Sequence, residues 1–294
     1  RTGCPLSGPR APGVNYTFAA AADSEITIAV VGLDPSLEGE EGDTVASPTG
    51  GDRDAIELPQ VQRDFLVELR KHARKLIVVL TGGSAIAVPE VHEFADAMLQ
   101  VWYPGCEGGE AVADVLFGDA NPSGRLPVTV PRRTGDLPPF EDYAMRGRTY
   151  RFATIEPLYP FGFGLGYARF RYDAVKLTTD RLTAGQGLGV QATLMNQSEH
   201  AADEIVHCNI VTPRLTDETP LATLVAFEKV NVPAHRSVDV FFQLPAECLA
   251  QVDAAGQRIH APGRYQVVVG PASPGPRAQA LGAPDPVVAG LTLA

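Results

Sequence analysis

The stretch Ile26-Thr27-Ile28-Ala29-Val30-Val31-Gly32-Leu33 decides how the first half of the chain folds. It is short, apolar and rich in β-branched residues, and it ends near a glycine, as is typical of a strand buried in a parallel sheet. The runs Lys75-Leu76-Ile77-Val78-Val79-Leu80 and Ala97-Met98-Leu99-Gln100-Val101-Trp102 have the same character. Together, the three runs predict neighbouring strands of one sheet.

Helical patterns separate these strands. Over residues 58–75 the apolar side chains recur on one helix face, and Pro59 suits the first turn of a helix. Further helices are predicted over residues 92–97 and 109–117. Because strands alternate with helices, we expect an α/β fold, a layered α/β sandwich with a mostly parallel sheet.

The pattern changes near residue 170. Short alternating strands separated by turn residues follow, with clear examples at residues 189–194, 204–211, 237–242 and 265–269. This pattern predicts an all-β immunoglobulin-like (fibronectin type III-like) sandwich. The predicted organisation is a Pro-, Gly- and Ala-rich linker arm (1–22), the α/β domain (23–172) and the β-sandwich (173–294).

Composition excludes several classes of function. The 294 residues suffice for two domains, and 45% of them are hydrophobic. The net charge is −11, with no basic run longer than Arg132-Arg133, which argues against binding to nucleic acid. No apolar stretch is long enough to span a bilayer, so we expect a soluble protein without a membrane partner. The chain starts at Arg1 rather than Met, and we expect that a segment upstream is missing.

Metal and cofactor sites are not expected. The four cysteines are scattered, and neither they nor the histidines have metal-ligand spacing, so we expect mostly free, buried thiols. Thr81-Gly82-Gly83-Ser84 lacks the lysine and the spacing of a phosphate-binding loop and is interpreted as a close backbone turn. No serine lies in a G-x-S-x-G motif, which disfavours a serine hydrolase.

The acidic segment Leu37-Glu38-Gly39-Glu40-Glu41-Gly42-Asp43 follows the first predicted strand, at the end where ligands bind in such sheets. It is either a solvated charge run, which composition alone favours, or the site of an acid/base carboxyl whose pKa is raised by its neighbours. Downstream, Asp52 and Arg53 either cap a helix and add a surface charge or form a charge pair that fixes the acidic segment.

Several long motifs resemble family 3 glycoside hydrolases. The resemblance covers residues 103–127 (YPGCEGGEAVADVLFGDANPSGRLP) and 158–167 (LYPFGFGLGY). Residues 32–41, and the blocks at 136–143 and 147–151, look most like the β-xylosidase-type members. Residues 171–294, with Pro262-Gly263-Arg264-Tyr265 near the last strand, resemble the fibronectin type III-like domain that follows in many members.

The resemblance implies a retaining β-glycosidase that uses two carboxyls. In the family, a barrel domain supplies the aspartate nucleophile, and that barrel is absent from this sequence. The acid/base is a glutamate on a loop of the α/β sandwich, and the matching loop holds Glu40, the first choice, and Glu41, its rival. Glu38 would bind a sugar hydroxyl or orient the loop, and Asp52 and Arg53 would anchor it.

The same resemblance implies further properties. Trp102 and Tyr103 would line the sugar-side surface, although a core position for Trp102 is equally expected. The substrate would be an oligosaccharide or aryl glycoside, with xylose favoured over glucose, and no cofactor is needed. The partner would be the barrel, as a domain or as a separate chain, and a secreted or periplasmic location is favoured. The alternative is a non-catalytic carbohydrate-binding or structural fragment.

Overall fold

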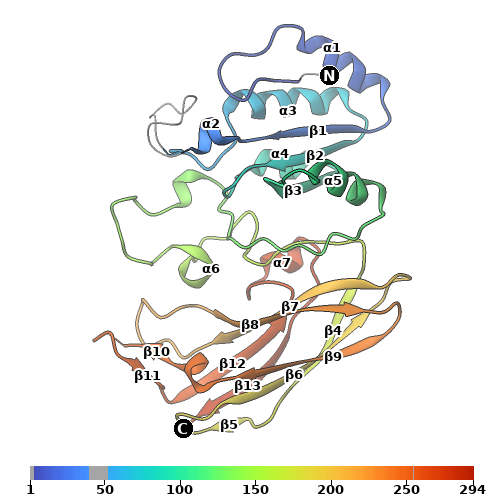
Figure 1. Cartoon of the computed structure of the whole chain (residues 1–294). Helices are drawn as coiled ribbons and strands as arrows, with labels where there is room; N and C mark the ends of the chain where they lie inside the picture. The colour runs from blue at the N-terminus through green and yellow to red at the C-terminus, as the bar shows by residue number, and fades with distance from the viewer. Residues whose placement is uncertain (1–2, 40–51, 254) are drawn as a thin grey trace. The chain divides into compact units, whose positions relative to one another are not determined.

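The computed structural model describes residues 3–39, 52–253 and 255–294. The chain divides into two compact units (Figure 1). Unit 1 comprises residues 1–117 and 130–136, and unit 2 comprises residues 118–129 and 137–294. The sequence placed a domain boundary near Tyr172, and that boundary stays a prediction.

Unit 1 is built on a parallel sheet. Its strands are β1 (Thr27–Gly32), β2 (Leu76–Thr81) and β3 (Ala97–Trp102), in the order β1-β2-β3. All three strands were predicted from their β-branched, apolar runs. The central strand β2 is the most buried, because it has a hydrogen-bonded neighbour on each side.

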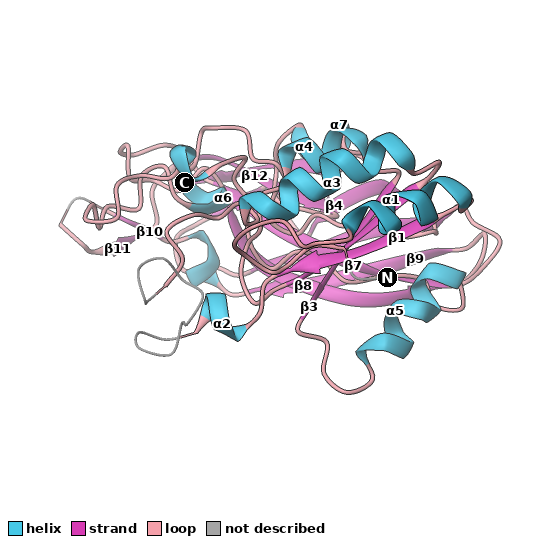
Figure 2. Cartoon of the chain, turned by 90° about the horizontal axis from the view of Figure 1, so that it is seen from above, coloured by secondary structure: helices cyan, strands magenta, loops and turns pink. Residues whose placement is uncertain are grey.

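Helices lie on both sides of this sheet (Figure 2). The helices α3 (Gln60–His72) and α4 (Pro89–Phe94) lie on one side, and α5 (Gly108–Phe117) lies on the other. Helices α3 and α5 confirm the sequence prediction, whereas α4 starts and ends three residues earlier than the predicted helix over residues 92–97. The amphipathic helix α3 buries Phe65, Leu66 and Leu69, which the helical spacing had placed on one face.

The expected linker over residues 1–22 differs from the structure. Its second half forms helix α1 (Val14–Asp23), which buries Val14, Phe18 and Ala21. The ring of Phe18 stacks on Phe65 and His72 of α3, at centroid distances of 5.8 and 5.1 Å. Composition suggested a loop because the stretch is rich in Pro, Gly and Ala. Every proline and glycine in it lies before Val14, however, alanine is the best helix former, and packing against α3 stabilises the helix.

A further segment is tied to unit 1 by one carboxylate. Glu57 accepts hydrogen bonds from the amide and the hydroxyl of Thr134, at 2.8 and 2.5 Å, and the Ile56 amide donates to the same hydroxyl at 2.9 Å. Thr134 opens the short 3-10 helix η1 (Thr134–Asp136). These bonds explain why residues 130–136 fold with unit 1 although residues 118–129 do not.

Unit 2 is dominated by antiparallel strands. One sheet has the order β5-β13-β12-β7-β8, a second has the order β4-β6-β9, and β10 pairs with β11. The four strands predicted from alternation are β6, β7, β9 and β12. The strand bounds are β4 Phe170–Leu177, β5 Arg181–Leu182, β6 Leu188–Asn196, β7 Ala202–Val211, β8 Thr223–Val232, β9 Ser237–Leu244, β10 Gln251–Val252, β11 Arg258–Ile259, β12 Gly263–Gly270 and β13 Val287–Leu293.

Alternate residues of these strands form one apolar core. In β6 every second side chain is buried, as expected for a strand with one face in a sandwich. The core includes Leu194, Val206, Val240 and Val267. Three short helical turns complete the unit: α6 (Thr149–Phe152), η2 (Ala246–Leu249) and α7 (Arg277–Ala280). The predicted β-sandwich following an α/β fold is therefore present.

Candidate functional site

Three loops meet at the carboxyl ends of the strands in unit 1. Parallel strands end on the same edge of a sheet, so the loops that follow them are neighbours in space although they are far apart in sequence. After β1 the chain forms one helical turn, α2 (Pro35–Glu38). The Asp34 side chain caps this turn by accepting a bond from the Ser36 amide at 2.9 Å, and the buried Leu37 anchors it in the core. Glu38 is thereby fixed at the end of the turn.

Glu38 is the centre of a hydrogen-bond network. Its Oε2 accepts from the Gly83 amide at 2.7 Å and from the Tyr103 hydroxyl at 2.5 Å. Its Oε1 accepts from the Ser84 hydroxyl and lies 3.6 Å from Nε of Arg53. The Glu38 and Arg53 side chains are only 10% and 15% exposed. One carboxylate therefore joins all three loops.

The network determines the protonation of Glu38. Burial raises the pKa of this carboxyl, but the hydrogen bonds from Ser84, Tyr103 and Gly83 and the charge of Arg53 outweigh burial and leave the pKa lowered. Burial and the hydrogen bond to Glu38 raise the pKa of Tyr103 to about 12, so the phenol stays protonated and donates a hydrogen bond to Glu38. Glu38 is accordingly an ionised acceptor.

Arg53 joins the network from a second direction. Its Nη2 donates to the Ser84 hydroxyl at 2.5 Å and to the Ala85 carbonyl at 3.1 Å. Of the two readings left open by the sequence, this geometry favours a charge pair over a surface charge for Arg53. The neighbouring Asp52 has an exposed side chain. The structure thus brings together Glu38 and Arg53 among the residues singled out from the sequence.

Glu40 and Glu41 lie outside the described residues, and their assignment as acid/base stays a prediction. The residue before them, Gly39, follows Glu38 directly and ends α2 with an extended backbone. The acidic segment therefore starts from the fixed end of α2.

Sequence reasoning missed three hydrogen-bond partners of Glu38. Thr81-Gly82-Gly83-Ser84 was interpreted as a simple backbone turn, yet it supplies the Gly83 amide and the Ser84 hydroxyl. Tyr103 was expected at a sugar-side surface, without a hydrogen-bond partner being named. The position of these residues could have found all three, because each lies within four residues after a predicted strand of the same parallel sheet.

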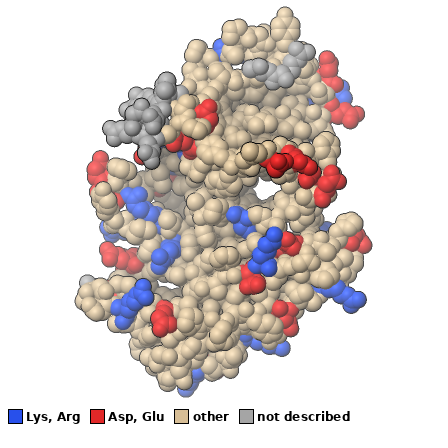
Figure 3. All heavy atoms as spheres, in the orientation of Figure 1, with Lys and Arg blue, Asp and Glu red and all other residues tan. Residues whose placement is uncertain are grey.

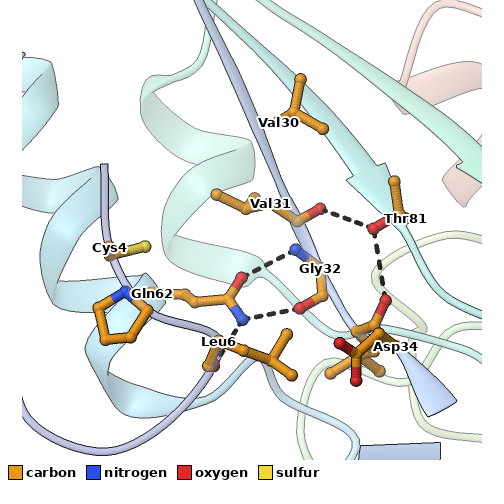
Figure 4. A pocket seen from close by; sticks show the side chains of 10 residues that line it. Cys4, Leu6, Val30, Val31, Gly32, Asp34, Gln62 and Thr81 are labelled. Atoms are coloured by element: carbon orange, nitrogen blue, oxygen red, sulfur yellow. Dashed lines mark hydrogen bonds between the residues drawn. The ribbon is translucent and has the colours of Figure 1, made fainter. Parts of the chain in front are cut away.

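A pocket of about 260 Å³ lies beside this site, at the end of β1 (Figure 4). Its most buried polar side chain is Gln62, which donates to the carbonyls of Leu6 and Gly32 and accepts from the Gly32 amide. Cys4 also lines it, but burial raises the pKa of that thiol, which disfavours a reactive thiolate. Gln62 therefore holds the backbone of Leu6 and Gly32 in place, and the candidate functional site is the hydrogen-bond network around Glu38.

Other classes of site find little support. Among residues 3–39, 52–253 and 255–294, no group of three or more His, Cys, Asp or Glu side chains is placed to hold a metal ion. All four cysteines are free, although only Cys208 is fully buried. Across the described helices, none is both long and apolar enough to cross a membrane. On the face drawn in Figure 3, Lys and Arg side chains stand singly or beside acidic ones.

Comparison with known families accounts for both units. Residues 12–167 match the model of the glycosyl hydrolase family 3 C-terminal domain, and residues 204–273 match the fibronectin type III-like domain. A crystal structure of a Bifidobacterium adolescentis GH3 beta-glucosidase superimposes with a TM-score of 0.81 at 26% identity, over 97% of this chain and 42% of that one.

The curated relatives that this chain matches are considerably longer than the chain. A xylan 1,4-beta-xylosidase of Xylanibacter ruminicola is 41% identical over 244 residues, which cover 82% of this chain and 28% of the relative. A periplasmic beta-glucosidase of Salmonella typhimurium is 29% identical, over 89% of this chain and 35% of the relative. The chain thus spans about a third of the length of the relatives that it matches.

Proposed function

Because the chain belongs to glycosyl hydrolase family 3, we propose that it is part of a retaining, exo-acting β-glycosidase. In this proposal the chain supplies the general acid/base glutamate, and a barrel domain, on the same or another polypeptide, supplies the aspartate nucleophile. The substrate is a terminal β-linked sugar of an oligosaccharide or an aryl glycoside. We favour β-xylosidase activity over β-glucosidase activity, since the relative with 41% identity is named for xylan.

The observation that carries the proposal is the network around Glu38. An acid/base residue must be held at a fixed place, and the acidic segment starts from a carboxylate joined to Gly83, Ser84 and Tyr103. Glu38 itself does not fit the role of acid, because its oxygens accept hydrogen bonds and its pKa is lowered. Glu40, the residue that the family resemblance implies, is the proposed acid/base, with Glu41 as the alternative.

The proposed chemistry runs in two steps. The acid carboxyl donates its proton to the glycosidic oxygen as the bond from that oxygen to the anomeric carbon breaks and the nucleophile's oxygen bonds to the same carbon. The resulting carboxylate then takes a proton from water, whose oxygen displaces the nucleophile at that carbon. The acid carboxyl must hold its proton at neutral pH, which requires a raised pKa. Burial by the barrel and the charges of the neighbouring carboxylates would both raise it.

Exposed apolar side chains on β1 support the proposal that a further segment binds to unit 1. Ile28 and Val30 of β1 are 47% and 66% exposed, and the preceding Ile26 is exposed as well. Parallel sheets are normally covered on both faces, and contiguous exposed apolar side chains mark interaction surfaces. The barrel-bearing segment is the proposed partner.

The test is an assay of the chain, alone and mixed with a barrel-bearing segment, on aryl β-xyloside, aryl β-glucoside and an unactivated disaccharide. The same assay is run with Glu40→Gln and Glu41→Gln. We expect activity only in the mixture, and loss of activity in one variant, with the larger loss on the disaccharide because its leaving group needs the proton. A mixture inactive on every substrate, or two variants that match the parent, would favour a non-catalytic carbohydrate-binding or structural fragment.

A further inference from the structure

The Tyr103 side chain is held by its hydroxyl and along one edge of its ring, and yet it is exposed. Its hydroxyl donates to Glu38 at 2.5 Å, while the ring packs against Gly83 so closely that a Cβ at residue 83 would lie 2.9 Å from Cε2 of Tyr103. The side chain nevertheless remains 47% exposed. The ring is therefore fixed in orientation, with part of its surface open to solvent.

The backbone before this ring is strained. Trp102 has a φ of 55°, a left-handed conformation that bulky residues rarely adopt. The pairing of β2 with β3 shifts between Leu80 and Thr81, so that Trp102 lies opposite Thr81. Irregularities of this kind redirect side chains, and strained residues of this kind concentrate at functional sites. Here the irregularity directs Tyr103 onto Glu38.

We propose that the ring of Tyr103 is the stacking surface for the leaving-group sugar of the β-glycoside. The chemistry of the site suits a pyranose: an aromatic ring offers a flat apolar surface for the C–H groups of a sugar ring, and Ser84 and Arg53 lie on the same carboxylate as polar neighbours. The ring lies at the carboxyl ends of parallel strands, where ligands bind.

The choice of the leaving-group sugar rests on the proposed function. The acid protonates the oxygen that departs with this sugar, and the proposed acid follows Glu38, the residue to which Tyr103 is bonded, by two positions. An aromatic ring on that same network is therefore placed for the sugar beyond the bond that breaks. The alternative occupant is the terminal sugar, whose pyranose ring could stack on an aromatic side chain in the same way.

A binding test works on the chain alone. Trp102 is the only tryptophan and precedes Tyr103, so all tryptophan fluorescence comes from this position. We expect a saturable change with xylobiose that is kept in Tyr103→Phe and lost in Tyr103→Ala, whereas Tyr16→Ala, at an exposed tyrosine of α1, behaves like the parent. Urea unfolding establishes that each variant is folded. The proposal is overturned if the parent gives no change, or if Tyr103→Ala titrates like the parent.

A kinetic test separates stacking from positioning. In a polypeptide that also carries the barrel, kcat/KM is compared for xylobiose and methyl β-xyloside, both of which need protonation but only one of which has a leaving-group ring. Tyr103→Ala should lower the xylobiose value by about three- to tenfold more than the methyl β-xyloside value, mainly through KM. Equal losses would assign Tyr103 to positioning or to the terminal sugar and refute the proposal. A parent inactive on both substrates would refute the proposed function instead, leaving the fluorescence titration to decide about Tyr103.

Discussion

Arg125 and Glu204 form a buried ion pair across 79 residues of sequence, with Nη2 of Arg125 2.7 Å from Oε2 of Glu204. The two side chains are 8% and 2% exposed. Burial raises the pKa of Glu204 and outweighs the opposing effect of Arg125. This pair joins residues 118–129 to strand β7, which explains why that short segment folds with the β-sandwich.

Removing one partner of this pair should be costly. Arg125→Met leaves the carboxylate of Glu204 buried without its cation, and we expect unit 2 to lose about 3–5 kcal/mol of unfolding free energy. The measurement is urea unfolding followed by circular dichroism. Arg171→Met is the matched control, because Arg171 pairs with Asp173 at 2.5 Å on the surface and should have little effect. Equal effects of the two variants would contradict the interpretation.

His207 should make unit 2 sensitive to acid. Burial, together with the charge of Arg125, lowers the pKa of His207 to about 4, whereas an unfolded histidine titrates near 6.5. Stability from this group is therefore complete above pH ~6.5 and is lost as the pH falls toward 4, by about 3 kcal/mol over the window. Thermal unfolding followed by circular dichroism should show a flatter pH dependence for His207→Gln than for the parent. Parallel profiles would mean that His207 is not the responsible group.

Glu38→Ala should destabilise unit 1. The substitution removes the acceptor of the Gly83 amide and of the Ser84 and Tyr103 hydroxyls, and donors left without an acceptor cost about 1–3 kcal/mol. Trp102 fluorescence during urea unfolding reports on this unit. The exposed Glu107→Ala is the control and should unfold like the parent. A Glu38→Ala variant as stable as the parent would remove the structural basis for anchoring the acidic segment.

Helix α1 should contribute to unit 1 through Phe18. Phe18 is 5% exposed and stacks on α3, so Phe18→Ala should cost about 3–5 kcal/mol. Tyr16→Ala tests the solvent side of the same helix, since Tyr16 is 73% exposed, and should cost little. The readout is again unfolding followed by Trp102 fluorescence. If both variants matched the parent, the segment would be the linker that its composition suggested.

The open face of β1 should matter for association rather than for folding. Val30→Asp places a charge on an exposed apolar position, so the chain should unfold like the parent while losing activity in a mixture with the barrel-bearing segment. Phe241→Asp, at an exposed position of β9, is the control and should keep that activity. Full activity of the Val30→Asp mixture would show that this face is not the contact surface.

Much of the architecture could be predicted from sequence because it depends on local pattern. The apolar runs gave β1, β2 and β3, and alternation gave four strands of the β-sandwich, since burial on one or both faces is recorded in the spacing of apolar residues. Helix α1 was not predicted, because Phe18 packs against Phe65 and His72 of another helix and the local sequence pattern does not show such contacts.

For the site, sequence alone indicated an approximate place: a cluster of carboxylates after the first strand, with Arg53 downstream. Only the tertiary structure decided which groups meet there. Gly83 and Ser84 follow β2 and Tyr103 follows β3, and the parallel sheet brings them to Glu38 because its strands all end on one edge. No pattern along the chain records such contacts, since each hydrogen bond joins residues 45 to 65 positions apart.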